Sequence, residues 1–144
     1  MAQADRKYIR WRNAPARTAG QADRRAISVG IKLGRRTAAV FEAAERRAGL
    51  VYVPVAVMWE CSLLARVGRI ELRRSVHAFF DDLFSNPAYQ PVDLTPEQLY
   101  LADESRSNDD PFDALICAAA RHLNVPLLTR DSDIHDFDLV RAVW

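Results

Sequence analysis

The chain has 144 residues, of which 49% are hydrophobic, and this length is typical of one domain with a sizeable core. Its net charge of +1 hides an asymmetry: residues 1–47 carry twelve Lys and Arg against four Asp and Glu, and residues 48–144 carry eight against fifteen. The first third therefore favours a polyanionic partner, and the longest apolar run, residues 50–59, is too short for a membrane helix, which needs roughly 18 residues.

Residues 1–31 carry little pattern. Arg, Ala and Gln dominate, the apolar residues keep no period, and short strands are predicted only at residues 8–11 and 26–31. The basic, acid-poor composition is also that of an organelle transit peptide, an alternative that stays open. A surface for RNA phosphates and a disordered basic tail are two further interpretations of the arginines at positions 6, 10, 12, 17, 24, 25, 35 and 36.

Regular patterns begin near residue 36. The predicted elements are a helix over 36–48, a buried strand over 50–54, a helix over 55–67, a helix over 70–84, a strand over 91–94 and a helix over 96–104. Thr95, Pro96 and Gln98 supply the N-cap, the first-turn proline and the capping-box partner of the last of these helices. Alternating strands and helices predict an α/β fold with a mostly parallel sheet.

The most informative stretch is residues 109–133. Asp110 is a natural N-cap with Pro111 at the first helical position, and apolar residues recur behind it at helical spacing. We therefore predict a helix over residues 111–122, which Asn124 ends.

A short buried strand is predicted at residues 126–129, and residues 137–144 are predicted to form a last, edge strand. A helix packed on a parallel sheet starts at the edge where the strands end and returns the chain to a strand that reaches the same edge. Asp113, near the start of the helix, and Asp131, after the strand, are therefore expected at one edge of the sheet.

Glu60 is a second anchor. It follows the strand at 50–54 by six residues and stands in the apolar text VAVMWECSLLA. Burying such a carboxylate unpaired costs several kcal/mol, so it needs a cation or a hydrogen-bond donor. The alternative is a glutamate on a narrow polar stripe with Ser62, Arg66 and Arg69.

Taken singly, the acidic residues have structural explanations: Asp113 suits the first turn of its helix, and Asp131 and Asp133 suit the cap of a following turn. These explanations do not account for the convergence of Glu60, Asp113 and Asp131, with Asp133 nearby, from three segments onto one edge. Clustered carboxylates repel each other unless hard cations lie between them, and their oxygens suit Mg²⁺ or Mn²⁺. Such a site can activate water and stabilise the charge of a phosphodiester transition state.

Other chemistry is sparse. Cys61 and Cys117 lie in apolar helical patterns without the paired spacing of a disulfide framework, which favours a reducing compartment and hence the cytoplasm. His122 and His135 have no metal-type spacing, and we interpret them as surface or capping residues. The sequence has no Gly-rich phosphate loop with Lys and Ser or Thr, and no serine elbow.

The motifs WECSLLARVGRI and DPFDALICAAARHLNVPLLTRDSDI, with the short final strand, resemble those of PIN-domain nucleases, in particular the toxins of VapBC toxin–antitoxin pairs. The resemblance covers residues 32–144. It implies a three-layer α/β/α PIN-like domain with a mostly parallel sheet, Mg²⁺- or Mn²⁺-dependent cleavage of RNA, a homodimer, and neutralisation by a cognate antitoxin protein. By position it implies that Glu60, Asp113 and Asp131 are catalytic metal ligands, that Asp133 is an accessory metal-binding carboxylate, and that Thr129 is a polar neighbour.

The N-terminus departs from that family, whose members begin with a hydrophobic strand ending in an Asp that is a central metal ligand. At the expected spacing before Leu33 the text is APARTAGQAD, and Asp5 and Asp23 are the only carboxylates upstream of Glu42. We therefore expect residues 1–31 to be an atypical basic segment without the family's first strand and Asp, explained by disorder or a shifted reading frame, and residues 32–144 to form the PIN-like domain.

Loss of one acidic ligand weakens a carboxylate site, so the sequence leaves two functions open. One is a ribonuclease of a type II toxin–antitoxin system with impaired activity. The other is a catalytically inactive PIN-fold protein that binds an antitoxin or another partner. A phosphoryl-accepting receiver domain also clusters acids at a sheet edge, but it needs an acceptor Asp at the end of a central strand, and the strand at 50–54 ends without one.

Overall fold

The computed structural model describes residues 6–9, 34–129 and 131–144. The elements in chain order are β1 (Arg6–Ile9), α1 (Arg35–Glu45), β2 (Leu50–Pro54), α2 (Val55–Arg66), α3 (Val76–Phe84), β3 (Tyr89–Val92), α4 (Pro96–Glu104), α5 (Pro111–Leu123), β4 (Leu127–Leu128), α6 (Ser132–His135) and β5 (Ala142–Val143). None of the helices described is long and apolar enough to cross a membrane.

The strands form one sheet in the order β3-β2-β1-β4-β5, and every pair of neighbouring strands is parallel. The α/β fold class with a parallel sheet, predicted from the alternation of elements, is therefore confirmed. Because all pairs are parallel, the carboxyl ends of the strands lie along one edge of the sheet. Residues that directly follow β2 and β4 therefore start from the same edge.

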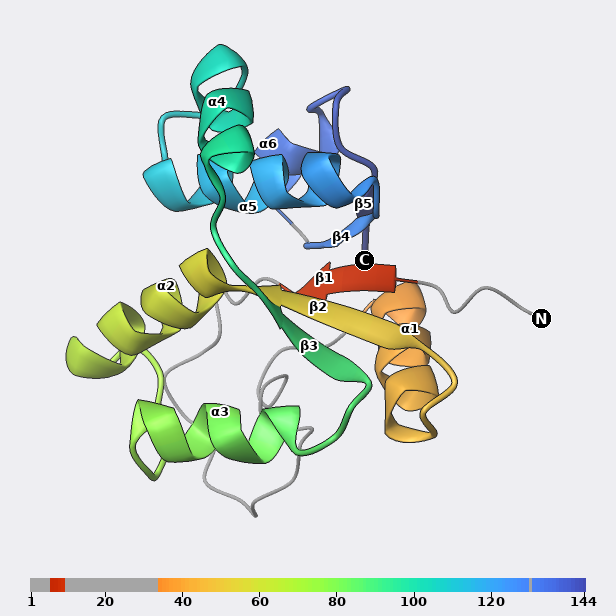
Figure 1. The fold of residues 1–144 in the computed structure, drawn as a ribbon, viewed down its shortest axis with the longest axis vertical. Coiled ribbons are helices and arrows are strands. Elements are labelled where there is room, and N and C mark those ends of the chain that lie inside the picture. The colour runs from red at the N-terminus through yellow and green to blue at the C-terminus, as the bar shows by residue number, and fades with distance from the viewer. Residues whose placement is uncertain (1–5, 10–33, 130) are drawn as a thin grey trace.

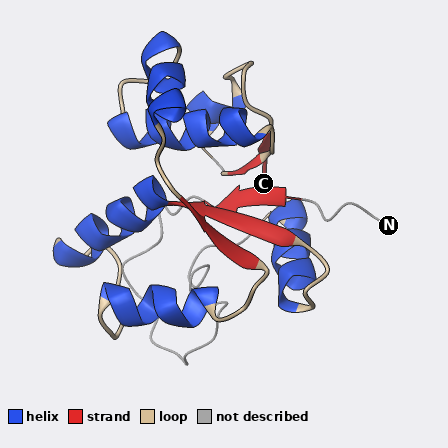
Figure 2. Cartoon of the chain, viewed as in Figure 1, coloured by secondary structure: helices blue, strands red, loops and turns tan. Residues whose placement is uncertain are grey.

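Helices pack around this sheet. Figure 1 shows α4, α5 and α6 grouped above the strands in that view, α2 to their left, α1 to their right and α3 below them; Figure 2 shows the same arrangement coloured by secondary structure. Contacts join α4 to α5 and also join α2 to α5. The helix that carries Glu60 therefore packs against the helix that carries Asp113.

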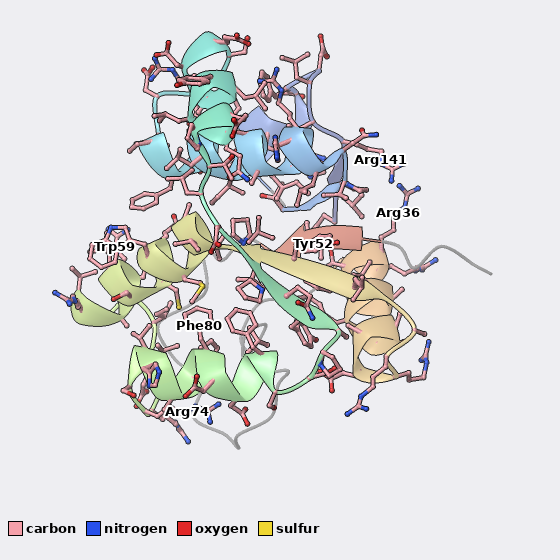
Figure 3. The ribbon with its side chains drawn as sticks, in the orientation of Figure 1. Arg36, Tyr52, Trp59, Arg74, Phe80 and Arg141 are labelled. Atoms are coloured by element: carbon pink, nitrogen blue, oxygen red, sulfur yellow. The ribbon has the colours of Figure 1, made fainter. Side chains whose placement is uncertain are left out.

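The core lies between the sheet and these helices, and it draws on most elements. Its members include Val51 and Val53 of β2 and Leu127 and Leu128 of β4, which are all at most 1% exposed. In Figure 3 Phe80 of α3 lies on the side of the helix nearer the strands. Its ring meets that of Phe79 edge-on, with centroids 5.1 Å apart and planes at 86°, an arrangement that adds to the free energy gained from apolar burial.

Local signals place several helix ends where the sequence predicts them. Thr95 Oγ1 accepts a hydrogen bond from the Gln98 backbone N–H at 3.3 Å, and α4 covers the predicted residues 96–104. Asn124 adopts the left-handed conformation with φ 51° and ends α5, as predicted. The last helical residue is Leu123, one residue after the predicted end at 122. These ends depend on side chains within one turn of the helix, which is why the sequence reveals them.

Four predicted boundaries are wrong. The helix predicted over 36–48 ends at Glu45, and Arg47 has φ 57°. The helix predicted over 70–84 begins only at Val76, because Arg73 has φ 57° and Ser75 caps the helix by accepting from the Ala78 backbone N–H at 3.1 Å. The strand predicted over 91–94 lies at Tyr89–Val92. The last strand, predicted within residues 137–144, is at the sheet edge as expected but covers only Ala142–Val143.

The N-terminus contains a strand, β1, which begins two residues before the weakly predicted strand at residues 8–11 and overlaps it. β1 lies in the middle of the sheet, with Tyr8 opposite Tyr52 of β2 and Leu127 of β4. The predicted lack of a first strand is therefore corrected by this pairing, whereas the strand predicted at residues 26–31 falls outside the described residues.

The chain's last residue packs against the start of α1. A Cβ atom added to Gly34, the residue before α1, would overlap the backbone and the side chain of Trp144. Gly34 is thus needed for close approach of two backbones and not for an unusual conformation, since its φ is −59°.

Candidate active site

Glu60 is a buried acid on α2. This helix begins at Val55, directly after the last residue of β2, so it leaves from the carboxyl edge of the sheet. Glu60 is 4% exposed, whereas its neighbour Trp59 is 52% exposed and points outward in Figure 3. The alternative interpretation of Glu60 as part of a solvated polar stripe is therefore wrong, and this carboxylate must be stabilised inside the protein.

The charge of Glu60 affects the next residue. Burial raises the pKa of the Cys61 thiol to about 12, and the nearby negative charge of Glu60 adds to the rise. A thiol with such a pKa stays protonated at neutral pH and is a poor nucleophile. Cys61 therefore acts as a small apolar residue beside the carboxylate.

Asp113 stands at the start of α5. Asp110 caps this helix, with Oδ1 accepting from the backbone N–H groups of Phe112 at 2.8 Å and of Asp113 at 3.1 Å. The Asp113 side chain is fully buried, although it belongs to the first turn, where an acidic side chain usually faces solvent. The position of Asp113 in the first turn thus agrees with the capping explanation. Capping does not explain why its side chain is buried.

Asn108 connects the acidic residues, and sequence reasoning missed it. Its Nδ2 group donates to Asp113 Oδ2 at 2.7 Å and makes a longer contact of 3.5 Å with Asp133 Oδ2. Its Oδ1 atom accepts from the Asp110 backbone N–H at 2.8 Å. An amide nitrogen has two protons to donate, so one Asn can serve both carboxylates. The only signal in the sequence is a polar residue two positions before the N-cap of α5.

Asp131 caps α6, as one of its explanations predicted. Its Oδ1 atom accepts from the backbone N–H groups of Asp133 at 3.0 Å and Ile134 at 3.4 Å. Its own N–H donates to Thr129 Oγ1 at 3.1 Å, so the buried Thr129 is the polar neighbour that was predicted. Asp131 and Asp133 are therefore held together after β4, and Asn108 links them to Asp113.

His135 contacts the backbone of Thr129, next to the acidic residues. One of its ring nitrogens, Nε2, lies 2.7 Å from the Thr129 carbonyl oxygen, and the residue ends α6. This agrees with its interpretation as a capping or surface residue. His122, near the end of α5, is exposed.

The carboxylates of this region suit a magnesium ion that keeps part of its water shell better than a metal ion bound by protein ligands alone. Among the described residues, no three His, Cys, Asp or Glu side chains are grouped so that they could hold a metal ion. However, Mg²⁺ commonly uses one or two carboxylates and completes its shell with water and substrate phosphates. Glu60 and Asp113, two buried carboxylates on helices in contact, are suited to that mode, and ligation by Glu60, Asp113, Asp131 and Asp133 stays a prediction.

The end of β1 lacks a carboxylate. Ile9 pairs with Leu128 of β4, and the next residues in the sequence, Arg10 and Trp11, are not acidic. Most of the arginines considered for RNA binding lie outside the described residues. Of those described, Arg35 and Arg36 are exposed at the start of α1, and Figure 3 shows Arg36 on the opposite side of the view from Trp59.

Comparison with known proteins agrees with this fold. A model of the PIN domain matches residues 23–140. A chain from the crystal structure of VapBC2 from Rickettsia felis, bound to a DNA fragment from their promoter, has a TM-score of 0.55 at 15% identity. The alignment covers 74% of this chain and 82% of that chain, and at this identity it shows a shared fold. No curated protein matches the chain.

Proposed function

Because this chain belongs to the PIN domain family, we propose that it is a Mg²⁺-dependent endoribonuclease, the toxin of a type II toxin–antitoxin pair, acting in the cytoplasm. The burial of Glu60 and Asp113 on two helices in contact supports this most strongly. Burying charged carboxylates costs free energy, and buried charged groups are therefore found mainly at functional sites. A divalent cation is the partner that this chemistry fits.

Each acidic residue has its own part in the proposed site. Glu60 and Asp113 hold the cation from α2 and α5. Asp131 fixes the turn into α6 through its capping bonds, and this places Asp133 within reach of Asn108. Magnesium bound there would activate a water molecule and neutralise charge on the scissile phosphodiester. The protein supplies fixed positions for these oxygens, since all lie on helix starts or on the buried face of a helix.

The second candidate function keeps the fold without catalysis. The absence of an acidic residue directly after Ile9 favours it, because a site with fewer carboxylates binds Mg²⁺ more weakly. In that case the chain is an antitoxin-binding or interaction module. The proposed ribonuclease should accordingly be less active than a complete site of this type.

An RNA cleavage assay separates the two functions. Purified protein is incubated with single-stranded RNA and Mg²⁺, beside Asp113→Asn and beside Asp103→Asn, whose exposed carboxylate lies on α4. We expect cleavage by the wild type and by Asp103→Asn, and none by Asp113→Asn or after addition of EDTA. Equal, negligible cleavage by all three proteins would exclude the enzyme and leave the binding module.

The proposed partners are the RNA substrate, a cognate antitoxin protein and a second copy of the chain. Apolar side chains exposed on α2 and α4 offer contact area for a protein partner: Val55, Trp59, Leu99 and Tyr100. Sedimentation of the purified protein tests the homodimer, which would have twice the monomer mass of 16.3 kDa. A monomer at all concentrations would remove this part of the proposal.

A further inference from the structure

Asn108 is unusual among the polar residues of the loop between α4 and α5, because it contacts three separate parts of the acidic region. Its Nδ2 group lies 2.7 Å from Asp113 Oδ2 and 3.5 Å from Asp133 Oδ2, while Oδ1 is 2.8 Å from the Asp110 backbone nitrogen. Asp133 is 25 residues away in sequence. A single side chain therefore joins the loop, the start of α5 and the start of α6.

The partners fix the orientation of this amide. The Asp110 N–H can only donate, so it must face the oxygen of Asn108, and the ionised carboxylates of Asp113 and Asp133 can only accept, so they face the nitrogen. A reversed amide would put an oxygen against the Asp113 carboxylate at the same distance, which is repulsive. The orientation follows from the chemistry of the partners.

We propose that Asn108 is a positioning residue: it holds the carboxylates of Asp113 and Asp133 in the separation and orientation needed for a divalent cation. This inference rests on the proposed function. Donating to one oxygen of a carboxylate leaves the other oxygen directed elsewhere and keeps the group in one rotamer. Donors of this kind, one step behind the ligands, set the geometry of a metal site, and their loss typically costs about 10- to 100-fold in metal affinity or activity.

Asn108 also carries structure, so the test must separate positioning from stability. Asn108→Ala loses the bonds to both carboxylates and the bond from the Asp110 N–H. Asn108→Gln is the conservative variant, because it keeps the amide donor and acceptor and moves them only one methylene further from the backbone. Ser75→Ala is the matched control: it removes the cap of α3, which typically costs about 1 kcal/mol, and leaves Asn108 and its partners in place.

The primary readout is the dissociation constant of Mn²⁺ in the absence of RNA, measured by electron paramagnetic resonance, because Mn²⁺ accepts the same oxygen ligands as Mg²⁺. Asn108→Ala should raise this constant about 10- to 100-fold. Asn108→Gln should bind closer to the wild type, and Ser75→Ala should bind like the wild type although its melting temperature falls. Equal Mn²⁺ affinity for Asn108→Ala and the wild type, or an equal loss in Ser75→Ala, would overturn the proposal.

RNA cleavage, measured in parallel, separates this inference from the proposed function. A wild type that binds Mn²⁺ more tightly than Asn108→Ala but cleaves no RNA would remove the ribonuclease and keep the role of Asn108. A wild type that cleaves RNA, with Asn108→Ala equal to it in Mn²⁺ affinity and rate, would keep the ribonuclease and remove the role of Asn108. A wild type that neither binds Mn²⁺ nor cleaves RNA would overturn both.

Discussion

Glu60 lies next to Cys61 on the buried side of α2, and the negative charge of Glu60 adds to the burial that raises the pKa of the Cys61 thiol to about 12. The ordinary value is 9.0. Adjacent residues of a helix are about 100° apart around its axis, so both are buried only where the buried face of the helix is wide. Here α2 is apolar on most sides, so both can be enclosed.

This relationship predicts how stability depends on alkaline pH. The unfolded chain releases the Cys61 proton near pH 9, while the folded chain keeps it up to about pH 12, so the folded state binds more protons in that window and loses stability as the pH rises. Urea unfolding between pH 8 and pH 11 should therefore show a steeper decline for the wild type than for Cys61→Ala, by up to about 1.4 kcal/mol per pH unit. Parallel declines would contradict the assigned burial.

The buried carboxylate of Glu60 predicts a trade between stability and metal binding. Glu60→Gln keeps the shape of the side chain and removes the cost of burying a charge, so the metal-free variant should be more stable than the wild type by on the order of 1 kcal/mol. Mg²⁺ should raise the melting temperature of the wild type through linkage and leave the variant almost unchanged. Differential scanning calorimetry with and without Mg²⁺ measures both effects.

Glu42→Gln is the matched control for that experiment. Glu42 is an exposed acid on α1, so its substitution should change neither the metal-free stability nor the response to Mg²⁺. An equal Mg²⁺-induced rise in melting temperature for Glu60→Gln and the wild type would show that Glu60 is not a ligand.

The contact between Gly34 and Trp144 gives a prediction about the ends of the folded region. Gly34→Ala forces the backbone of Trp144 away and should destabilise the protein by about 1–3 kcal/mol, as overpacking does. In a chain that lacks Trp144 the same substitution should cost much less. Unfolding free energies of the four proteins form a double-mutant cycle, and strictly additive effects would show that the two residues are not in contact.

The missing carboxylate after β1 predicts a gain of affinity on its restoration. β1 lies between β2 and β4 in the sheet, and its last residue, Ile9, pairs with Leu128 at the end of β4, close to the edge from which α2 and the Asp131 turn begin. Arg10→Asp should therefore bind Mg²⁺ more tightly than the wild type, whereas Arg10→Ala, which only removes the positive charge, should gain less. Calorimetric titration compares them, and no difference between the two variants would oppose a metal site at this edge.

Local signals explain how much of the fold the sequence revealed. β2 covers the predicted residues 50–54, and α4 and α5 start where Thr95 and Asp110 cap them. In each case the cause lies within one turn or one apolar run, which a single sequence displays. α3 begins later than predicted because Ser75 supplies a cap that interrupts an otherwise continuous helical period.

The elements that were predicted only weakly, or not at all, depend on contacts distant in sequence. β1 has only Tyr8 and Ile9 as apolar residues, and pairing with β2 and β4 on both sides provides its hydrogen-bond partners. α6 has only four residues, too few to show a helical period. Glu60, Asp113 and Asp131 could be chosen as candidate site residues from the sequence, because their capping positions and apolar context are local. Asn108 could not, because its contact with Asp133 joins residues 25 positions apart.

In the proposed mechanism, the acidic edge of the sheet binds Mg²⁺ and uses it to cleave RNA. The most direct test is the initial rate of RNA cleavage as Mg²⁺ is added back to the metal-free wild type, with Asp113→Asn measured beside it. We predict a rate that rises with Mg²⁺ and saturates for the wild type, and no rise for Asp113→Asn. A wild-type rate that never exceeds that of Asp113→Asn at any Mg²⁺ concentration would contradict Mg²⁺-dependent cleavage at this edge.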